Sequence, residues 1–322
     1  MTLGMLGTSG IAVSTVGLGC NAFGARIDAE RTQAVVDACF AQGVTFFDTA
    51  DVYGLGQSEE LLGRALGGRR DEVVVATKFG MDMQGVNGDD GGARGRPEYV
   101  RRACEASLRR LGTDVIDLYQ LHTPDPSTPI EETLGALDEL VREGKVRAIG
   151  CSNFQAWQLV DAAWVARTRE LTSFATAQNE YSLYNRTAEV ELTPACAELG
   201  VGLLPYFPLA YGLLTGKYRR DEPPAEGTRL AEDTQRRRYD AADWDTIEAL
   251  RRFAEERGIS LLEVAIGGLA AQPQVASVIA GATRADQIAS NVAAGRWTPS
   301  DADLEALNQI GRPRQSYTTF AP

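Results

Sequence analysis

Eight short apolar runs rich in β-branched residues alternate with helix-like segments along nearly the whole chain, and this alternation restricts the fold more than any other feature. Several runs are almost continuously apolar, as the strands of a parallel sheet are when helices cover it. Eight strand–helix units in register predict an α/β fold, a closed (β/α)8 TIM barrel. The expected strands are residues 15–20, 44–48, 73–78, 115–122, 146–152, 174–179, 201–206 and 276–281.

The segments between these runs carry helix start and stop signals. Asp28 is placed to cap a helix over 29–41, and Gly43 is placed to end it. A proline begins the segment 97–111, and Gly112 follows it. Further helices are expected at 58–66, 129–143, 155–166, 188–199, 246–271, 284–293 and 301–309, with Gly258 dividing the longest of them.

The N-terminal stretch and two long connections fall outside the strand–helix repeat. The first residues, LGMLGTSGIAVS, predict a β-hairpin around 7–10 with no helix of its own. The connection 79–96, after the third strand, is rich in Gly and Asp and is expected to be mobile, and the connection 210–239, after the seventh strand, is rich in Pro and Arg. Loops of this length in a compact domain usually act as lids. Without an internal repeat or a linker, residues 1–322 are expected to form one domain.

Composition excludes several classes of function. A net charge of −12 argues against a nucleic-acid partner and against an anionic membrane surface. The 5 cysteines are scattered and there is 1 histidine, so we expect neither a disulfide framework nor a metal site. No apolar stretch approaches the roughly 20 residues of a membrane span, and the first residues do not resemble a signal peptide. A cytoplasmic chain, either a monomer or a weak homo-oligomer, is therefore expected.

Four residues with useful chemistry fall at one end of the predicted barrel. The second, third and fourth strands end in Asp48, Lys78 and His122, and Tyr53 follows in the loop DTADVYG. Reactive residues of such barrels lie at the carboxyl ends of the strands. Taken singly, each has an ordinary structural role: a helix cap, a lysine whose stem alone is buried, a hydrogen-bonded core histidine and a loop aromatic. Their convergence on one rim favours a shared chemical role.

A tyrosine beside a lysine suits the protonation of an oxygen. A tyrosine hydroxyl ordinarily titrates near 10, which makes it a weak acid at neutral pH. A cation roughly 4 Å away contributes about 4 kcal/mol at an effective dielectric of 20, or close to three pKa units. We therefore expect Lys78 to lower the pKa of Tyr53 and Asp48 to orient Lys78. His122, in its neutral form, would aim a substrate carbonyl, and the matching hydride must come from a cofactor.

Six motifs extend this pattern along the chain. They are DTADVYG (48–54), VVVATKFG (73–80), DLYQLH (117–122), AIGCSN (148–153), QNEYSLYNR (178–186) and PYFPLAYGLLTGKY (205–218). In their order and spacing, the sequence resembles the aldo-keto reductase family, of the bacterial type. The resemblance implies an NADP(H)-dependent oxidoreductase that reduces aldehydes or ketones to alcohols. It also implies that Tyr53 is the general acid and that Lys78, Asp48 and His122 assist it.

The resemblance also implies where the cofactor binds. Ser152, Asn153 and Gln178 would hydrogen-bond the nicotinamide carboxamide, and Tyr206 would stack on the ring. Without the four catalytic residues, turn chemistry would be the simpler role for the three polar side chains. The other cofactor contacts expected are Gly19, Cys20, Asn21, Phe207, Pro208, Leu209, Gly216, Lys217, Gly281, Thr283, Arg284, Gln287 and Asn291.

The phosphates of such a cofactor need local positive charge on an acidic protein. Barrels often bind phosphate near the loops after the seventh and eighth strands, and a helix N-terminus favours anions. Arg284 opens the helix after the eighth strand, with Gln287 and Asn291 on the same helix. We expect Arg284 to face the 2′-phosphate of NADPH; the alternative is an ordinary surface position.

Three places depart from the family pattern. Phe207 stands where many relatives have serine, and Ala280 stands where many have proline. The Lys-Ser phosphate pair of the eukaryotic branch is replaced by Gly281 and Ala282. The preference for NADPH over NADH therefore rests on fewer residues than the catalytic assignment does.

Two other functions compete with this interpretation. GLGCNA (17–22) matches the Rossmann pattern G-x-G-x-x-A, and Asp48 ends the next strand. That motif requires a helix to begin at the glycines, yet residues 23–25 intervene before the expected cap at Asp28. The other alternative is a cofactor-binding regulator with little turnover, because barrels of this resemblance also serve as channel-associated subunits. An intact set of catalytic residues disfavours it.

Overall fold

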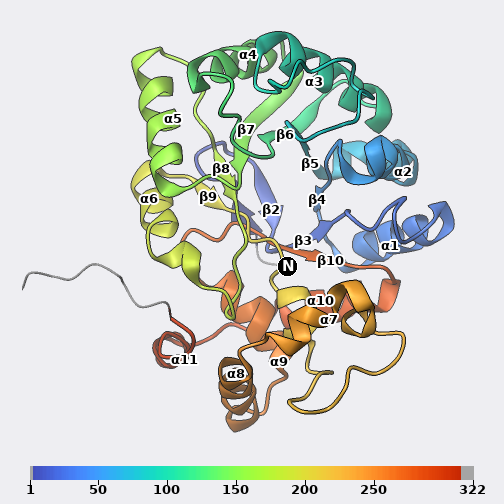
Figure 1. Cartoon of the computed structure of the whole chain (residues 1–322), viewed down its shortest axis with the longest axis vertical. Coiled ribbons are helices and arrows are strands. Elements are labelled where there is room, and N and C mark those ends of the chain that lie inside the picture. Colours follow the sequence, from blue (N-terminus) through green and yellow to red (C-terminus); the bar gives the residue numbers. More distant parts are fainter. Residues whose placement is uncertain (1–2, 313–322) are drawn as a thin grey trace, which may run out of the picture.

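The computed structural model describes residues 3–312, and within them eight parallel strands form a closed barrel with helices around the outside (Figure 1). The strand order is β10-β3-β4-β5-β6-β7-β8-β9, so consecutive strands are neighbours. The segments that contain β9 and β10 meet through isolated parallel bridges at Leu203–Val275 and Tyr206–Ile279, which close the ring. The expected TIM barrel is therefore confirmed.

Each expected strand is present. The eight are β3 (Val16–Gly19), β4 (Phe46–Asp48), β5 (Val74–Phe79), β6 (Ile116–Leu121), β7 (Val146–Ser152), β8 (Thr176–Gln178), β9 (Gly202–Leu203) and β10 (Val278–Gly281). Strand β9 is much shorter than the apolar run 201–206. Pro205 interrupts it, because proline has no N–H to donate to a ladder, and only its carbonyl takes part by accepting from Ile279 N at 3.0 Å.

The predicted N-terminal hairpin seals the amino-terminal end of the barrel. Strands β1 (Leu3–Met5) and β2 (Ala12–Ser14) pair antiparallel. Leu6, Ile11 and Val13 are buried in one apolar cluster with the residues that begin the barrel strands. Gly7 has a φ of 51°, and a Cβ there would lie 2.2 Å from Ala175 O, so the turn needs glycine. With this end closed by apolar contacts, only the carboxyl ends of the strands remain for a site.

Most helices agree with the sequence signals apart from small shifts at their ends. The expected helix 188–199 begins only at Leu192, and the second half of the expected helix 246–271 becomes a π-helix at Val264–Gly268. The helices in these segments are α1 (Ala29–Gln42), α2 (Gln57–Leu66), α3 (Pro97–Leu111), α4 (Ile130–Arg142), α5 (Ala156–Thr168), α6 (Leu192–Leu199), α8 (Trp244–Glu256), α9 (Leu261–Glu263), α10 (Ala285–Ala294) and α11 (Asp301–Leu307). Asp28 caps α1 by accepting from Arg31 N at 2.9 Å. Gly258, with a φ of 65°, separates α8 from α9 as expected.

The long connection after β9 contains structure that the sequence pattern did not indicate. It holds two short 3-10 helices (Ala210–Thr215 and Arg229–Ala231) and the helix α7 (Asp233–Asp240). The sequence of α7, DTQRRRYD, has no apolar stripe, and periodicity therefore cannot detect it. The hydroxyl of its one buried residue, Tyr239, lies 2.7 Å from Arg219 O and 2.6 Å from Glu222 O and shares its single proton between them, which ties the helix to its own loop.

Within residues 3–312, no helix combines the length and the apolar character needed to cross a bilayer. The assignment of residues 1–322 to a single domain stays a prediction, and it extends beyond the described residues at both ends.

Candidate active site

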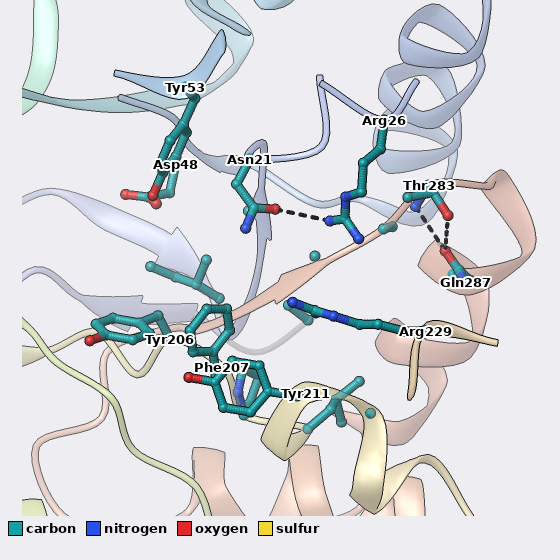
Figure 2. Close-up of a pocket in the computed structure, with 18 of the residues that line it drawn as sticks. Asn21, Arg26, Asp48, Tyr53, Tyr206, Phe207, Tyr211, Arg229, Thr283 and Gln287 are labelled. Carbon is teal, nitrogen blue, oxygen red and sulfur yellow. Dashed lines mark hydrogen bonds between the residues drawn. The ribbon is translucent and has the colours of Figure 1, made fainter. Parts of the chain in front are cut away.

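A cavity of about 720 Å³ opens at the carboxyl ends of the barrel strands (Figure 2). Its walls come from the strand ends and from the long connection after β9. The structure brings most of the residues predicted from sequence together here. Those that line the cavity are Gly19, Asn21, Asp48, Tyr53, His122, Ser152, Asn153, Gln178, Tyr206, Phe207, Pro208, Leu209, Lys217, Gly281, Thr283, Arg284 and Gln287.

Four predicted residues do not line the cavity. Cys20 is fully buried, and its Sγ contacts Leu18 O at 3.8 Å instead of facing the open space. Asn291 is buried on α10, and Gly216 lies just beyond the cavity wall, at the end of the 3-10 helix after β9. Lys78 is also buried, but it contacts two lining residues directly and so acts on the cavity from behind.

Lys78 connects Asp48 to Tyr53. Its Nζ donates to Asp48 Oδ2 at 2.6 Å and lies 3.5 Å from Tyr53 Oη. A third contact, to Thr49 O at 2.8 Å, completes its hydrogen bonds. Burial disfavours the ammonium, but the charge of Asp48, and then that of Tyr53 when its hydroxyl is ionised, raise the pKa of Lys78 above its ordinary value. Lys78 is therefore a buried cation directed at the tyrosine hydroxyl.

Asp48 is held by more partners than the sequence suggested. Its Oδ1 accepts from Gln178 Nε2 at 2.8 Å and from Gln120 Nε2 at 3.2 Å, in addition to the contact of Oδ2 with Lys78. These donors satisfy the buried carboxylate and fix its orientation. Gln120 was not among the predicted site residues. The signal was available, because Gln120 lies two residues before His122 and alternate residues of a strand share a face.

The surroundings of Tyr53 correct one expectation drawn from the sequence. Burial raises the pKa of Tyr53 and Lys78 lowers it, and with a further contribution from Asp48 the net result lies above the ordinary value. The sequence argument counted the cation but omitted the loss of solvent and the carboxylate that compensates the cation. Tyr53 is therefore a protonated phenol across the neutral range, and Lys78 limits how far its pKa rises.

His122 is neutral, as expected. Its ring lies edge-on to Tyr53, with centroids 5.8 Å apart. Burial, and then the charge of Lys78, lowers the pKa of His122 to about 3. Its Nδ1 has no hydrogen-bond partner among the described residues. A neutral imidazole keeps one N–H, which can donate to an oxygen in the cavity. We call Asp48, Tyr53, Lys78 and His122 the inner end of the cavity.

Beside the inner end, polar side chains connect His122 to an aromatic platform. Asn153 takes a left-handed backbone conformation (φ 61°), which asparagine tolerates better than most residues. Its Nδ2 donates to His122 O at 2.9 Å, and its Oδ1 accepts from Tyr206 Oη at 2.7 Å. Ser152 Oγ donates to Gln178 O at 2.8 Å. These contacts hold hydroxyl and amide groups next to the face of Tyr206.

Two arginines that the sequence analysis did not select face each other across the cavity (Figure 2). Arg26 comes from the β3–α1 connection, where it donates to Asn21 Oδ1 at 3.4 Å, and Arg229 comes from the connection after β9. Burial, then the charges of Arg26 and Arg238, lowers the pKa of Arg229. Since arginine stays protonated in proteins, the shift marks a charge that is partly buried and, in second place, repelled by the two neighbouring arginines. Arg26, Arg229 and Arg284 form what we call the outer end of the cavity.

Comparison with known proteins identifies the family to which this fold and this strand-end chemistry belong. The model of the aldo/keto reductase family matches residues 15–312. The chain belongs to the aldo/keto reductase family. It is by that membership an oxidoreductase, and the resemblance stated from the sequence motifs is confirmed.

Named relatives include both enzymes and channel subunits. "Probable aldo-keto reductase 1" of Glycine max is 36% identical, over 94% of this chain and 86% of its own length. "Uncharacterized oxidoreductase YrpG" of Bacillus subtilis (strain 168) is also 36% identical, over 95% and 94%. "Probable voltage-gated potassium channel subunit beta" of Oryza sativa subsp. japonica is 37% identical, over 90% and 89%.

In this aldo/keto reductase, Arg284 lies at the outer end but has a protein partner. It occupies the N-cap position of α10, and its guanidinium pairs with Asp286 at 2.9 Å. Both side chains are exposed, and an exposed pair of this kind contributes little, so a ligand can replace it. Next to it, Gln287 Oε1 accepts from Thr283 N at 2.8 Å, which orders the first turn of the helix.

The loop that carries Tyr206 holds its aromatic residues in an unusual backbone conformation. Phe207, Ala210 and Tyr211 all have positive φ values, of 53°, 46° and 60°. Such conformations cost energy and concentrate where a site needs them. The Phe207 and Tyr211 rings lie 4.3 Å apart, and the Arg238 guanidinium stacks 3.4 Å over Tyr211. Across residues 3–312, no three His, Cys, Asp or Glu side chains group as metal ligands would.

Proposed function

We propose that this aldo/keto reductase is an NADPH-dependent enzyme that reduces aldehydes or ketones to alcohols, with Tyr53 as the proton donor. The contact series Asp48–Lys78–Tyr53 carries the proposal, with distances of 2.6 Å and 3.5 Å from Lys78 Nζ. A buried ion pair often contributes no more stability than apolar side chains of the same size. The Asp48–Lys78 pair matters for the reaction, because it places a fixed cation beside the hydroxyl of a tyrosine in the cavity wall.

The residues around the cavity fit a nicotinamide dinucleotide. Ser152, Asn153 and Gln178 offer donors and acceptors that suit a carboxamide, and the ring of Tyr206 offers a face for stacking. When bound, the reduced nicotinamide supplies the hydride. Gly19, Asn21, Phe207, Pro208 and Leu209 form the remaining wall at this level of the cavity.

The outer end fits the phosphates of the same cofactor. Two like charges facing each other repel until an anion lies between them, and this protein, whose net charge is −12, places both arginines in the wall of the cavity. We assign Arg26 and Arg229 to the diphosphate and Arg284 to the 2′-phosphate. Lys217, Gly281, Thr283 and Gln287 complete this part of the wall.

The inner residues would divide the proton transfer among them. His122 donates its N–H to the carbonyl oxygen and so aims the carbonyl. As the carbonyl carbon is reduced, its oxygen becomes a strongly basic alkoxide, and Tyr53 donates its phenolic proton to that oxygen. Lys78 then stabilises the tyrosinate, and Asp48 keeps Lys78 charged and in place. An ordinary or slightly raised pKa of Tyr53 is sufficient, because an alkoxide is a far stronger base than a tyrosinate.

Replacing Tyr53 with Phe tests this proposal. Tyr53→Phe removes the donor and little volume, so carbonyl reduction should fall below about a hundredth of the wild-type rate. NADPH binding, followed by nucleotide fluorescence, should be unchanged, because other residues hold the cofactor. A panel of aldehydes and ketones, assayed by NADPH absorbance, supplies the reference rates. Retention of more than a hundredth of the rate would mean that another group donates the proton.

A regulatory role is the second candidate, since two relatives are named as probable voltage-gated potassium channel β subunits. In that case the cavity would bind NADPH with high affinity but the whole carbonyl panel would show almost no turnover. The same assay therefore separates the two functions.

A further inference from the structure

A second group of buried polar side chains lies beside the inner end and takes no part in the proposed reaction. Asp51 lies two residues before Tyr53, and its backbone N–H donates to Lys78 O at 3.1 Å. Glu59 comes from α2, Arg110 from α3, and Asn87 from the loop 80–96 that follows β5. Asp51 and Glu59 have no exposed surface, and Asn87 is 3% exposed.

The two carboxyl groups of this cluster differ in how they are partnered. Glu59 accepts from Thr77 Oγ1 at 2.5 Å and from Arg110 Nε at 2.6 Å, so both of its oxygens are occupied. Asp51 Oδ2 accepts from Asn87 Nδ2 at 3.0 Å, and its Oδ1 has no partner among the described residues. Arg110, the cation of the cluster, forms its ion pair with Glu59 and none with Asp51. Burial therefore penalises the charged form of the Asp51 carboxyl group.

The charge balance around Asp51 favours its protonated form at neutral pH. Burial, and then the charge of Glu59, raises the pKa of Asp51 to about 8, although Arg110 and the hydrogen bond from Asn87 act in the opposite direction.

The remaining titratable groups near Asp51 do not compensate its charge. Tyr99 of α3 and Tyr119 of β6 have pKa values raised mainly by burial, so both phenols stay neutral. Asp90 and Arg94, which belong to the loop itself, pair with each other at 2.6 Å. Deprotonation of Asp51 therefore adds a buried negative charge that has no ion-pair partner among the described residues.

Asn87 connects this cluster to the loop 80–96, which has no helix or strand of its own. While its Nδ2 donates to Asp51, its Oδ1 accepts from Arg110 Nη1 at 3.0 Å. Its backbone carbonyl accepts from Arg102 Nε at 2.6 Å. At the start of the same loop, Met81 lines the active-site cavity. The side chain of Asn87 thus ties to the buried cluster the same loop that contributes Met81 to the cavity wall.

We propose that Asp51 and Asn87 form a pH-dependent latch, in which loss of the Asp51 proton releases the loop 80–96 and with it the position of Met81. Asn87 is a positioning residue, and the part of the proposal that concerns substrate binding rests on the proposed function. When the loop opens, Asp51 meets water and returns to its ordinary acidity, so opening releases a proton. The opening equilibrium therefore rises with pH between about 4 and the folded-state pKa of about 8, by at most about tenfold per pH unit, and is constant above it.

Hydrogen exchange of the loop in the full chain, read by mass spectrometry from pH 5 to pH 9, tests the latch without reference to activity. In the wild type, protection of the loop peptides, corrected for intrinsic exchange, should fall as pH rises and level off near pH 8. Asp51→Asn, which mimics the protonated acid, should stay protected with no dependence on pH. Arg102→Ala is the matched control, because it removes a backbone contact of the loop. It should lower protection at every pH and keep the wild-type slope.

Two further measurements test the latch: hydrogen exchange in a second variant, and the dependence of KM on pH. If Asp51→Asn does not fold, Asn87→Ala should give a loop that is unprotected at all pH values and shows no slope. In the wild type, KM for a bulky carbonyl should rise with pH while NADPH affinity does not, and Asp51→Asn should remove that rise. A wild-type slope that survives in Asp51→Asn or Asn87→Ala would overturn the latch. Absence of turnover alongside the expected exchange profile would instead count against the proposed function.

Discussion

At the inner end of the cavity, the charge of Lys78 is buried and compensated by Asp48 at 2.6 Å, whereas at the outer end Arg26 and Arg229 face each other with no ion pair among residues 3–312. Of the inner residues, Asp48, Lys78 and His122 lie at strand ends and Tyr53 lies in the connection after β4. Arg26 and Arg229 lie in longer connections between elements. Paired buried charges are preorganised and need no ligand, while unpaired like charges become stable only when an anion arrives. We infer that the inner end carries out the reaction and that the outer end holds the cofactor. Changes at the inner end should therefore lower kcat, and changes at the outer end should raise the Kd for the cofactor.

The largest effect is expected from Lys78→Met. Without the cation, the pKa of Tyr53 should rise further and the tyrosinate should lose its stabilisation, so kcat for carbonyl reduction should fall by at least about 100-fold. In alcohol oxidation, where tyrosinate is the base, the basic limb of the rate profile should move to higher pH. Lys145→Met, at an exposed surface pair, is the matched control. If the basic limb of the pH–rate profile does not move, Lys78 does not control the pKa of Tyr53.

His122→Gln should have the next largest effect. The amide keeps a donor but places it differently, so kcat/KM should fall by about 100-fold, the typical cost of misplacing a reacting group. NADPH affinity should stay near that of the wild type. Because the pKa of His122 is about 3, the wild-type rate should show no break near pH 6.5. A break there that disappears in the variant would show that the histidine carries the proton.

Arg229→Ala tests the outer end. Loss of a charge-assisted contact costs about 1.5–3 kcal/mol, or roughly a 10- to 150-fold increase in the Kd for the cofactor. NADPH and NADH should be affected alike, since both contain the diphosphate, and kcat at saturation should change little. Arg220→Ala, on the same connection but away from the cavity, is the control. If Arg229→Ala lowers kcat but leaves the Kd for the cofactor unchanged, the two ends do not have the separate roles inferred above.

Arg284→Ala should have the smallest effect and the most selective one. Its guanidinium is exposed and shared with Asp286, so the loss should be at the lower limit, about 1.5 kcal/mol or roughly tenfold in the Kd for NADPH. NADH binding should barely change, because NADH has no 2′-phosphate. Titration of both nucleotides by fluorescence measures the difference. Equal losses for the two would assign the arginine to another part of the cofactor.

The local pattern of the sequence determined the barrel and most of its inner end. Apolar runs and caps such as Asp28 and Gly43 depend on neighbours within a few residues, so the strands and helices were predictable. Asp48, Lys78 and His122 followed from their positions at strand ends, because every parallel strand of a closed barrel delivers its last residue to the same rim. What remains a prediction is their role, together with the NADPH preference that the outer end suggests.

Tertiary structure decided what depends on residues far apart in the chain. Arg26 and Arg229 are two among 29 arginines, and only the folded loops place them face to face. The helix α7 has no apolar stripe by which the sequence could reveal it. The pKa of Tyr53 depends on both burial and the charge of Lys78, and the two effects could be compared only once the fold was known. Local periodicity records which side of an element is apolar, whereas solvent exclusion and charge pairing arise only when distant segments pack together.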